Sequence, residues 1–257
     1  MHPILIQLGP LYISSYTAAI ALGFLAAFVY TGREFDRRGF DRARTSQLQL
    51  LILLAGMAGS HWLHVLLHWR EYANQPLAAL AFWMPVGRVY LGGFLGATAV
   101  ALAYCRYAPL PMAICADIAA PSVALAQSIG RLGCFLAGCC YGAPSDLPWS
   151  VTFPPPAGQP GVAVHPTQLY ESAATLLLFL GLHRYLGRKD RPDGDVLVAY
   201  AFFYGIIRFG VELFRGDSRG TWVLGTFSPS QWIALILVLA AAVSHRRLAA
   251  RAQATAP

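Results

Sequence analysis

Seven apolar stretches of roughly membrane-spanning length follow one another along the chain. They cover residues 12–31, 47–69, 88–105, 110–130, 168–187, 195–214 and 229–245. About 20 consecutive apolar residues allow an α-helix to cross the hydrocarbon core of a bilayer. The fourth stretch fits least well, because Pro109, Pro111 and Pro121 interrupt it. The pattern predicts an all-α, polytopic membrane protein with about seven transmembrane helices.

The composition agrees with this interpretation. Of the 257 residues, 56% are hydrophobic and only 12% are charged, whereas about 25% are charged in an average soluble domain. The N-terminus lacks the basic segment of a cleaved signal peptide, so the first apolar stretch is expected to be retained. No internal repeat or second domain is visible, and residues 1–257 are expected to form a single integral membrane domain.

The net charge of +7 would suit nucleic acid, but its distribution favours a membrane topology. Thirteen of the nineteen basic residues fall in alternate loops: Arg33, Arg37, Arg38, Arg42, Arg44, Arg106, Arg184, Arg188, Lys189, Arg191, Arg246, Arg247 and Arg251. Basic loops stay in the cytoplasm by the positive-inside rule. The N-terminus is therefore predicted to lie outside and the C-terminus in the cytoplasm, and no nucleic-acid partner is expected.

The longest break between apolar stretches is a proline- and glycine-rich loop at residues 142–166. It contains seven prolines and no basic residue, so the charge rule places it on the outer, periplasmic side. Such a sequence cannot form a regular helix or a central strand. It is expected to be an ordered cap or a mobile lid over a site, or else a passive connector.

Two arginines lie within stretches that are otherwise apolar, Arg131 after the run 122–130 and Arg208 inside 199–214. An arginine at the centre of a transmembrane helix costs about 2.5–3.5 kcal/mol on insertion scales, so it needs a partner. An anion, such as a lipid phosphate, would serve. Alternatively, helix-end carbonyls or the Glu212 carboxylate, four residues after Arg208, would satisfy the guanidinium groups.

Three motifs carry a resemblance to a known family. They are Gly130-Arg131-Leu-Gly133-Cys134-Phe continuing to Gly142, His165-Pro-Thr-Gln168-Leu-Tyr-Glu171, and the segment from Arg208 through Glu212 to Arg215. Further matches in the same order include His2-Pro3 with Leu8-Gly9-Pro10, Tyr16, Gly92-Gly93, Asp117 with Pro121, and Gln231. With these motifs the chain resembles the prolipoprotein diacylglyceryl transferases.

The resemblance implies a transferase of lipoprotein biosynthesis in the bacterial inner membrane. Such enzymes move a diacylglyceryl group from phosphatidylglycerol to the cysteine thiol of a lipoprotein signal peptide and release glycerol phosphate; no cofactor is expected. It implies catalytic roles for Arg131, Arg208, Cys139 and His165. The expected substrate-binding positions are Tyr16, Gly92, Gly93, Gly130, Gly133, Cys134, Gly142, Gln168, Glu171 and Glu212.

The chain also departs from the family pattern. Leu91 stands where the family has histidine, Cys134 where it has asparagine and Cys139 where it has glutamate. His61 and His64 replace an arginine and a tyrosine. The lipid-binding half of the site is therefore expected to be retained, and the half that activates the acceptor thiol to be altered. A non-catalytic lipid- or metal-binding protein and a thiol-dependent oxidoreductase on the same scaffold are the alternatives.

The three clustered cysteines, Cys134, Cys139 and Cys140, allow three interpretations. Outside the cytoplasm, Cys134 would form a disulfide with one of the other two. A thiolate stabilised by Arg131 would be reactive. Thiolates together with His61, His64 and His68, which are expected on one face of a helix, would bind zinc or copper. Cys105 and Cys115 are expected to be small core residues.

The acidic residues near membrane spans are expected to be paired. Glu171 and Glu212 lie close to the two arginines in the predicted topology, whereas Asp117 is expected to tie helices together rather than to perform chemistry. His165 precedes a proline, so its backbone should be extended. It is expected either to carry a proton or to support the loop.

Overall fold

The computed structural model describes residues 4–8, 11–73, 77–80, 89–155, 161–216 and 227–254. His2, Pro3, Gly9 and Pro10 of the opening motif, and residues 156–160 of the long loop, lie outside the described residues. The chain divides into two compact units. One comprises Met1–Thr31 with Ala116–Pro257, and the other comprises Gly32–Cys115. The expectation of a single domain stays a prediction.

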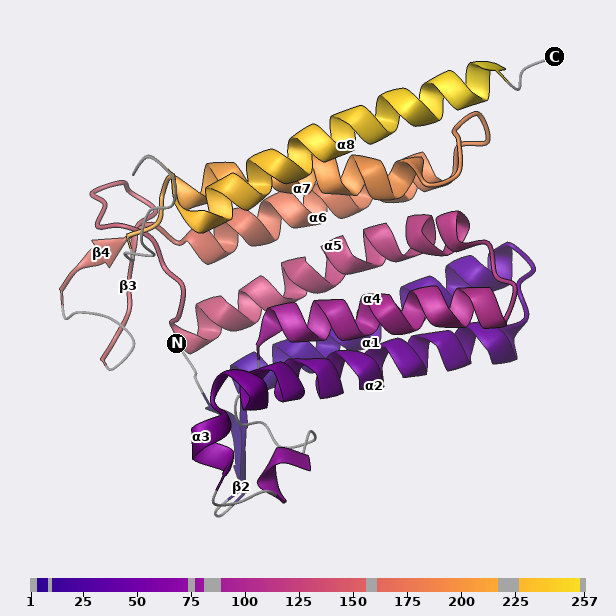
Figure 1. Cartoon of the computed structure of the whole chain (residues 1–257). Helices are drawn as coiled ribbons and strands as arrows, with labels where there is room; N and C mark the ends of the chain where they lie inside the picture. The colour runs from indigo at the N-terminus through magenta and orange to yellow at the C-terminus, as the bar shows by residue number, and fades with distance from the viewer. Residues whose placement is uncertain are drawn as a thin grey trace. The chain divides into compact units, whose positions relative to one another are not determined.

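Within the residues that the structure describes, one long helix overlaps each of the seven apolar stretches (Figure 1). These helices are α1 (Ser15–Arg37), α2 (Arg42–Leu67), α4 (Tyr90–Tyr107), α5 (Met112–Ala137), α6 (Thr167–Leu186), α7 (Asp195–Glu212) and α8 (Pro229–Ala254). Four of them, α1, α2, α5 and α8, are long and apolar enough to cross a membrane. The protein is therefore mostly helical and suited to a membrane.

Helix α5 extends beyond the fourth apolar stretch. It continues seven residues past Gly130, so that Arg131 and Cys134 are helical residues. The helix also runs through Pro121. Proline is tolerated in membrane helices where neighbouring groups satisfy the backbone that it leaves free. Arg131 is thereby held on a rigid element.

The larger unit is a set of closely packed helices. Helix α7 packs against both α6 and α8 (Figure 1). Ser128 of α5 and Ser172 of α6 each donate a hydrogen bond to the other's carbonyl oxygen, both at 2.9 Å. Helices α1 and α5 approach closely at Gly133, where a Cβ atom would lie 2.6 Å from the Ala19 Cβ. Small residues permit this approach, as is common between membrane helices.

Large apolar side chains project outward from these helices. Leu177 is 68% exposed, Ile236 is 63% exposed and Leu239 is 66% exposed. In a soluble protein such a surface would be an interaction patch. On helices that cross a membrane it contacts the lipid chains.

Asp117 of α5 contacts the segment that joins α6 to α7. Its carboxylate is fully buried and pairs with Arg191 Nη1 at 2.5 Å. It also accepts hydrogen bonds from the backbone N–H groups of Gly194 and Leu197, at 2.9 and 3.0 Å. The carboxylate thus satisfies donors at the N-terminus of α7. The expectation that Asp117 ties helices together is confirmed by this geometry.

Two small sheets were not foreseen by the all-α prediction. Strands β1 (Ile4–Leu8) and β2 (Leu11–Ser14) form an antiparallel pair, as do β3 (Val151–Thr152) and β4 (Ala163–Val164). A two-residue strand is too short to show the alternation that identifies a strand in a sequence. The second pair makes the described part of the 142–166 loop an ordered structure.

The smaller unit contains α2 and α4, which pack tightly through glycines, together with the short helices α3 (Trp69–Tyr72) and η1 (Ala78–Leu80). A Cβ atom on Gly92 would lie 2.5 Å from the Leu63 Cβ, and one on Gly93 would lie 3.0 Å from the Gly56 carbonyl oxygen. This packing explains both glycines. Their predicted role in substrate binding stays a prediction.

The histidines of the smaller unit do not form the expected helical face. Helix α2 ends at Leu67, so His68 caps the helix instead of belonging to it. Its ring stacks on that of His64, with centroids 4.2 Å apart. His61 is buried, and its Nε2 lies 3.2 Å from the Ala79 carbonyl oxygen. Among the described residues, the group suited to a metal comprises cysteines and none of these histidines.

Candidate active site

Three ion pairs gather at the ends of three helices in the larger unit. Arg131 of α5 lies 2.9 Å from a carboxylate oxygen of Glu171, near the start of α6. Arg208 lies 2.8 Å from Glu212 on the same helix, α7, and 4.0 Å from Glu171. Glu171 therefore links the two arginines. The expected pairing of both glutamates is confirmed.

The acidic and the basic side chains of these ion pairs differ in their exposure to solvent. The side chains of Glu171 and Glu212 are 2% and 5% exposed, while those of Arg131 and Arg208 are 23% and 14% exposed. The carboxylates are thus hidden behind the guanidinium groups. A buried carboxylate that lacked these partners would be strongly destabilised. This arrangement fixes the guanidinium groups and leaves that of Arg131 accessible.

Two serines that the sequence analysis missed complete the surroundings of Arg208. The Nη2 group of Arg208 donates to Ser230 Oγ at 3.2 Å. The hydroxyls of Ser228 and Ser230 donate to Glu212 Oε1 at 2.9 and 3.0 Å. Their position just before and inside the first turn of α8 is typical of residues at a helix start, and this signal could have identified them.

The Arg208 side chain retains unused hydrogen-bonding capacity. Its Nη1 atom is buried and has no hydrogen-bond partner among the described residues. Buried donors are nearly always paired in folded proteins, so an unpaired one suggests a missing ligand or water. A phosphate oxygen would be a suitable acceptor, because charge-assisted hydrogen bonds to guanidinium are strong.

A third arginine lies beside the cysteines. Arg215 donates from Nη1 to the Cys140 carbonyl oxygen at 2.9 Å. Arg131 and Arg215 both act electrostatically on the Cys140 thiol. The cysteine segment is thus bordered by two guanidinium groups.

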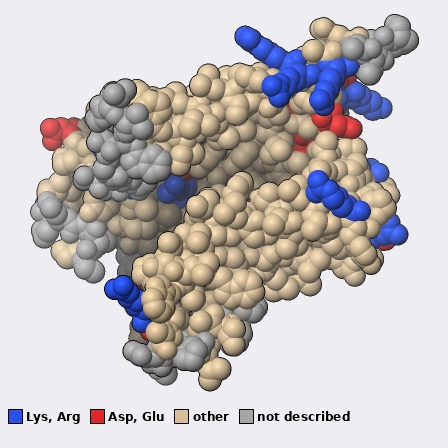
Figure 2. Space-filling model, viewed as in Figure 1, with Lys and Arg blue, Asp and Glu red and all other residues tan. Residues whose placement is uncertain are grey.

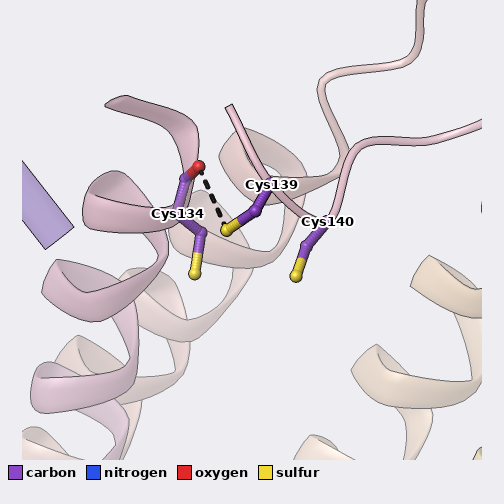
Figure 3. A group of neighbouring side chains, drawn as sticks. All are labelled: Cys134, Cys139 and Cys140. Atoms are coloured by element: carbon purple, nitrogen blue, oxygen red, sulfur yellow. Dashed lines mark hydrogen bonds between the residues drawn. The ribbon is translucent and has the colours of Figure 1, made fainter. Parts of the chain in front are cut away.

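The three cysteines lie beside one another (Figure 3), and Arg131 and Arg215 act electrostatically on Cys140. Cys134 lies near the end of α5, and Cys139 and Cys140 follow the helix. Their sulfur atoms all lie within 4.8 Å of one another. All three are free thiols, so the disulfide interpretation does not describe this structure.

The thiols of Cys139 and Cys140, which follow α5, have pKa values that depend on the neighbouring thiols. Hydrogen bonds from Cys134 and Cys139, helped by the charges of Arg215 and Arg131, hold the pKa of the Cys140 thiol below its ordinary value. Hydrogen bonding to Cys134 and Cys140 raises the pKa of the Cys139 thiol. The three thiols are therefore linked in their ionisation.

Gln168 holds the cysteine segment in place. Its Nε2 donates to the Cys139 carbonyl oxygen at 2.7 Å, and the neighbouring Thr167 hydroxyl donates to the Cys140 carbonyl oxygen at 2.9 Å. The Gln168 side chain is 1% exposed, and its Oε1 atom is without a hydrogen bond among the described residues. The side chain predicted to bind substrate thus also shapes the loop.

His165 lies where the 142–166 loop meets the ends of α6 and α7. Its Nδ1 atom is 3.3 Å from the Tyr170 hydroxyl, and its ring contacts that of Phe214 edge to face. Its carbonyl oxygen accepts a hydrogen bond from Gly142 N–H at 2.8 Å. These contacts support the loop, as one interpretation of the motif expected, whereas the catalytic role of His165 stays a prediction.

Gly142 is confined by the same junction. A Cβ atom there would lie 2.7 Å from the His165 Cβ and would collide with the Phe214 carbonyl oxygen. Packing therefore requires glycine at this predicted binding position. It does not by itself indicate a contact with substrate.

The first turn of α1 also borders the site. Tyr16 lies close enough to the three cysteines and to Arg131 for their charges to act on its hydroxyl. Gly133 lets α5 approach the Tyr16 backbone, and the neighbouring Gly130 contacts Ile20 of α1. Tyr204 of α7, which the sequence analysis missed, acts electrostatically on Arg131. The structure thus places Tyr16 near Arg131 and the cysteines, and its predicted role in substrate binding stays a prediction.

Comparison with known proteins gives a consistent result over nearly the whole chain. The family model described as prolipoprotein diacylglyceryl transferase matches residues 3–245. A phosphatidylglycerol–prolipoprotein diacylglyceryl transferase from Clostridium tetani is 35% identical over 240 residues, which are 93% of this chain and 94% of that protein. The protein of the same name from Geobacter sulfurreducens is 32% identical, with 96% and 97% covered.

Proposed function

The chain belongs to the prolipoprotein diacylglyceryl transferase family, and on that premise we propose that it transfers the diacylglyceryl group of phosphatidylglycerol to the cysteine thiol of a prolipoprotein. Relatives whose names state this activity match the chain over more than nine-tenths of its length. The resemblance of the motifs at Arg131, His165 and Arg208 points to the same reaction.

The observation that carries the proposal is the pair of arginines joined by Glu171. In the reaction, the thiol sulfur attacks the glyceryl carbon that bears the phosphate oxygen. A C–S bond forms, the C–O bond breaks, the thiol loses its proton, and glycerol phosphate leaves. Negative charge develops on the leaving phosphate, and preorganised cations stabilise it in a site that excludes water. Arg131 and Arg208 are suited to this role.

The roles of the remaining residues follow from their positions. Glu171 and Glu212 orient the guanidinium groups, and Gln168 offers a buried oxygen to a hydroxyl of the headgroup. Tyr16, Cys134 and Cys139 border the same space and would meet the acceptor. His165 would accept the proton of the prolipoprotein thiol when the bound substrate places that thiol beside it.

We further propose that the protein crosses the bacterial inner membrane seven times, with this site on the periplasmic side. Within the larger unit, the site lies where α7 ends and where α6 and α8 begin. Figure 2 shows Lys and Arg side chains gathered where α8 ends, which is the end of α8 away from the site. Basic segments remain in the cytoplasm, which supports an outward-facing site.

Reporter fusions at residues 40, 155 and 250 test this topology. We expect a reporter that is active only in the cytoplasm to work at residues 40 and 250, because basic residues precede both positions. A reporter active only in the periplasm should work at residue 155. Cytoplasmic activity at residue 155 would contradict both the topology and the periplasmic site.

Purified protein incubated with phosphatidylglycerol and a lipoprotein signal peptide tests the activity. We expect the release of glycerol phosphate together with a peptide whose mass has increased by one diacylglyceryl group. Lipid turnover without modification of the peptide would indicate a different acceptor, and neither product would contradict the proposed transfer.

A further inference from the structure

The three-cysteine cluster has a geometry that lipid transfer alone does not require. The cluster, defined as Cys134, Cys139 and Cys140, places three sulfur atoms within 4.8 Å of one another. Figure 3 shows the three side chains converging on a common space between the end of α5 and the segment that follows it. Three sulfur atoms that ligate one metal ion at bonds of about 2.3 Å lie roughly 4 Å apart, so small side-chain movements would bring these three into a ligating arrangement.

The cluster is held in place before any ligand arrives. Hydrogen bonds to the carbonyl oxygens of Cys139 and Cys140 come from Gln168, Thr167 and Arg215. Cys140 itself adopts a positive φ of 65°, which is uncommon for a residue other than glycine. A strained backbone persists only where its surroundings enforce it, and such positions gather at functional sites. The positive φ of Cys140 directs its thiol toward those of Cys134 and Cys139.

Charge supports the same conclusion. Three thiolates carry a charge of −3, and one monovalent ion reduces this to −2. Arg215, whose Nη1 lies 2.9 Å from the Cys140 carbonyl oxygen, places a positive charge beside the cluster.

We propose that Cys134, Cys139 and Cys140 form a binding site for one thiophilic d¹⁰ metal ion, with the three-thiolate coordination suited to Cu(I). Soft thiolate ligands select Cu(I) and Zn(II) among biological metals. Structural zinc almost always takes four ligands, and the group contains three suitable side chains among the described residues. Binding exchanges up to three thiol protons for the ion and involves no change of oxidation state. This inference does not rest on the proposed lipid transfer.

The other two cysteines provide a matched control. Cys105 and Cys115 belong to the smaller unit, are buried, and interact with each other. A variant with Cys105→Ala and Cys115→Ala retains the three-cysteine cluster, and a variant with Cys134→Ser, Cys139→Ser and Cys140→Ser retains the Cys105–Cys115 pair. Comparing the two variants separates binding at the cluster from binding at the pair.

The experiment titrates the reduced, detergent-solubilised full chain with Cu(I) under anaerobic conditions, against a chromophoric Cu(I) chelator. We expect the Cys105→Ala/Cys115→Ala variant to bind one Cu(I) per chain, with about three sulfur ligands by X-ray absorption. Changing a residue that merely supports a metal ligand typically costs about 10–100-fold in affinity, so Cys139→Ser should cost at least that much. Because Cys139 is exposed, this single variant should fold.

Thermal unfolding provides a second readout. Cu(I) should raise the unfolding temperature of the Cys105→Ala/Cys115→Ala variant and leave that of the triple serine variant unchanged, because a ligand of the folded state stabilises it. Equal Cu(I) affinity in the Cys105→Ala/Cys115→Ala variant and in the same variant with Cys139→Ser would overturn the proposal. So would no Cu(I) binding by the Cys105→Ala/Cys115→Ala variant while its three thiols remain reduced.

Discussion

Replacing either site arginine should abolish most of the turnover of phosphatidylglycerol while the protein still folds, because the other arginine still partners Glu171 and two serine hydroxyls still partner Glu212. Arg131→Ala and Arg208→Ala each remove charge-assisted hydrogen bonds to a desolvated phosphate, often worth about 1.5–3 kcal/mol each. That energy corresponds to a loss of roughly 10–100-fold in kcat/KM. Initial rates of glycerol phosphate release measure the effect.

Two further variants identify the cause of that loss. Arg131→Lys should recover little activity, because an ammonium group cannot reproduce the planar, bidentate contact of guanidinium. Arg247→Ala removes an exposed arginine at the far end of α8 and should leave turnover unchanged. Wild-type turnover in both Arg131→Ala and Arg208→Ala would limit these arginines to a structural role.

Loss of the Asp117 carboxylate should produce the largest loss of stability. The fully buried carboxylate pairs with Arg191 and accepts two backbone hydrogen bonds at the start of α7. Removing one partner of a buried pair leaves the other charge unsatisfied, at a cost of about 3–5 kcal/mol. Unfolding of Asp117→Ala in detergent should therefore begin at a much lower denaturant concentration than that of wild type.

The exposed pair of Arg188 with Asp190 supplies the control for this variant. The Arg188 guanidinium lowers the pKa of the Asp190 carboxyl to about 2, yet both side chains are open to solvent. Asp190→Ala should leave the unfolding midpoint unchanged, because solvent screens exposed pairs. Combining Asp117→Ala with Arg191→Met should recover part of the loss. An Asp117→Ala variant as stable as wild type would show that the pair does not stabilise the helices.

The positions of the long helices could be predicted because apolar length is a local property of the sequence. Ends were harder to predict: the apolar run stops at Arg131, but the helix continues because Glu171 pairs with that arginine. The pair of Arg208 with Glu212 lies four residues apart on one helix and was foreseeable. The pair of Arg131 with Glu171 joins two helices and depends on their packing.

The state of the cysteines could not be decided from spacing alone. Proximity along the chain was compatible with a disulfide, a reactive thiol or a metal site. The structure adds the proximity of the three sulfur atoms and the positive φ of Cys140, in a segment held by Thr167 of α6 and by Arg215, which follows α7. Short strands such as β3 and β4 were missed for a related reason, since their pairing is formed across a loop rather than within a local pattern.

The recognition of a lipid phosphate by Arg131 and Arg208 is tested most directly by comparing two lipids. Affinities for phosphatidylglycerol and for diacylglycerol, which lacks the phosphate, would be measured with wild type, Arg131→Ala and Arg208→Ala. We expect wild type to prefer phosphatidylglycerol by more than about tenfold, and each alanine variant to lose most of this preference while binding diacylglycerol as before. An undiminished preference in both variants would contradict phosphate recognition by these arginines.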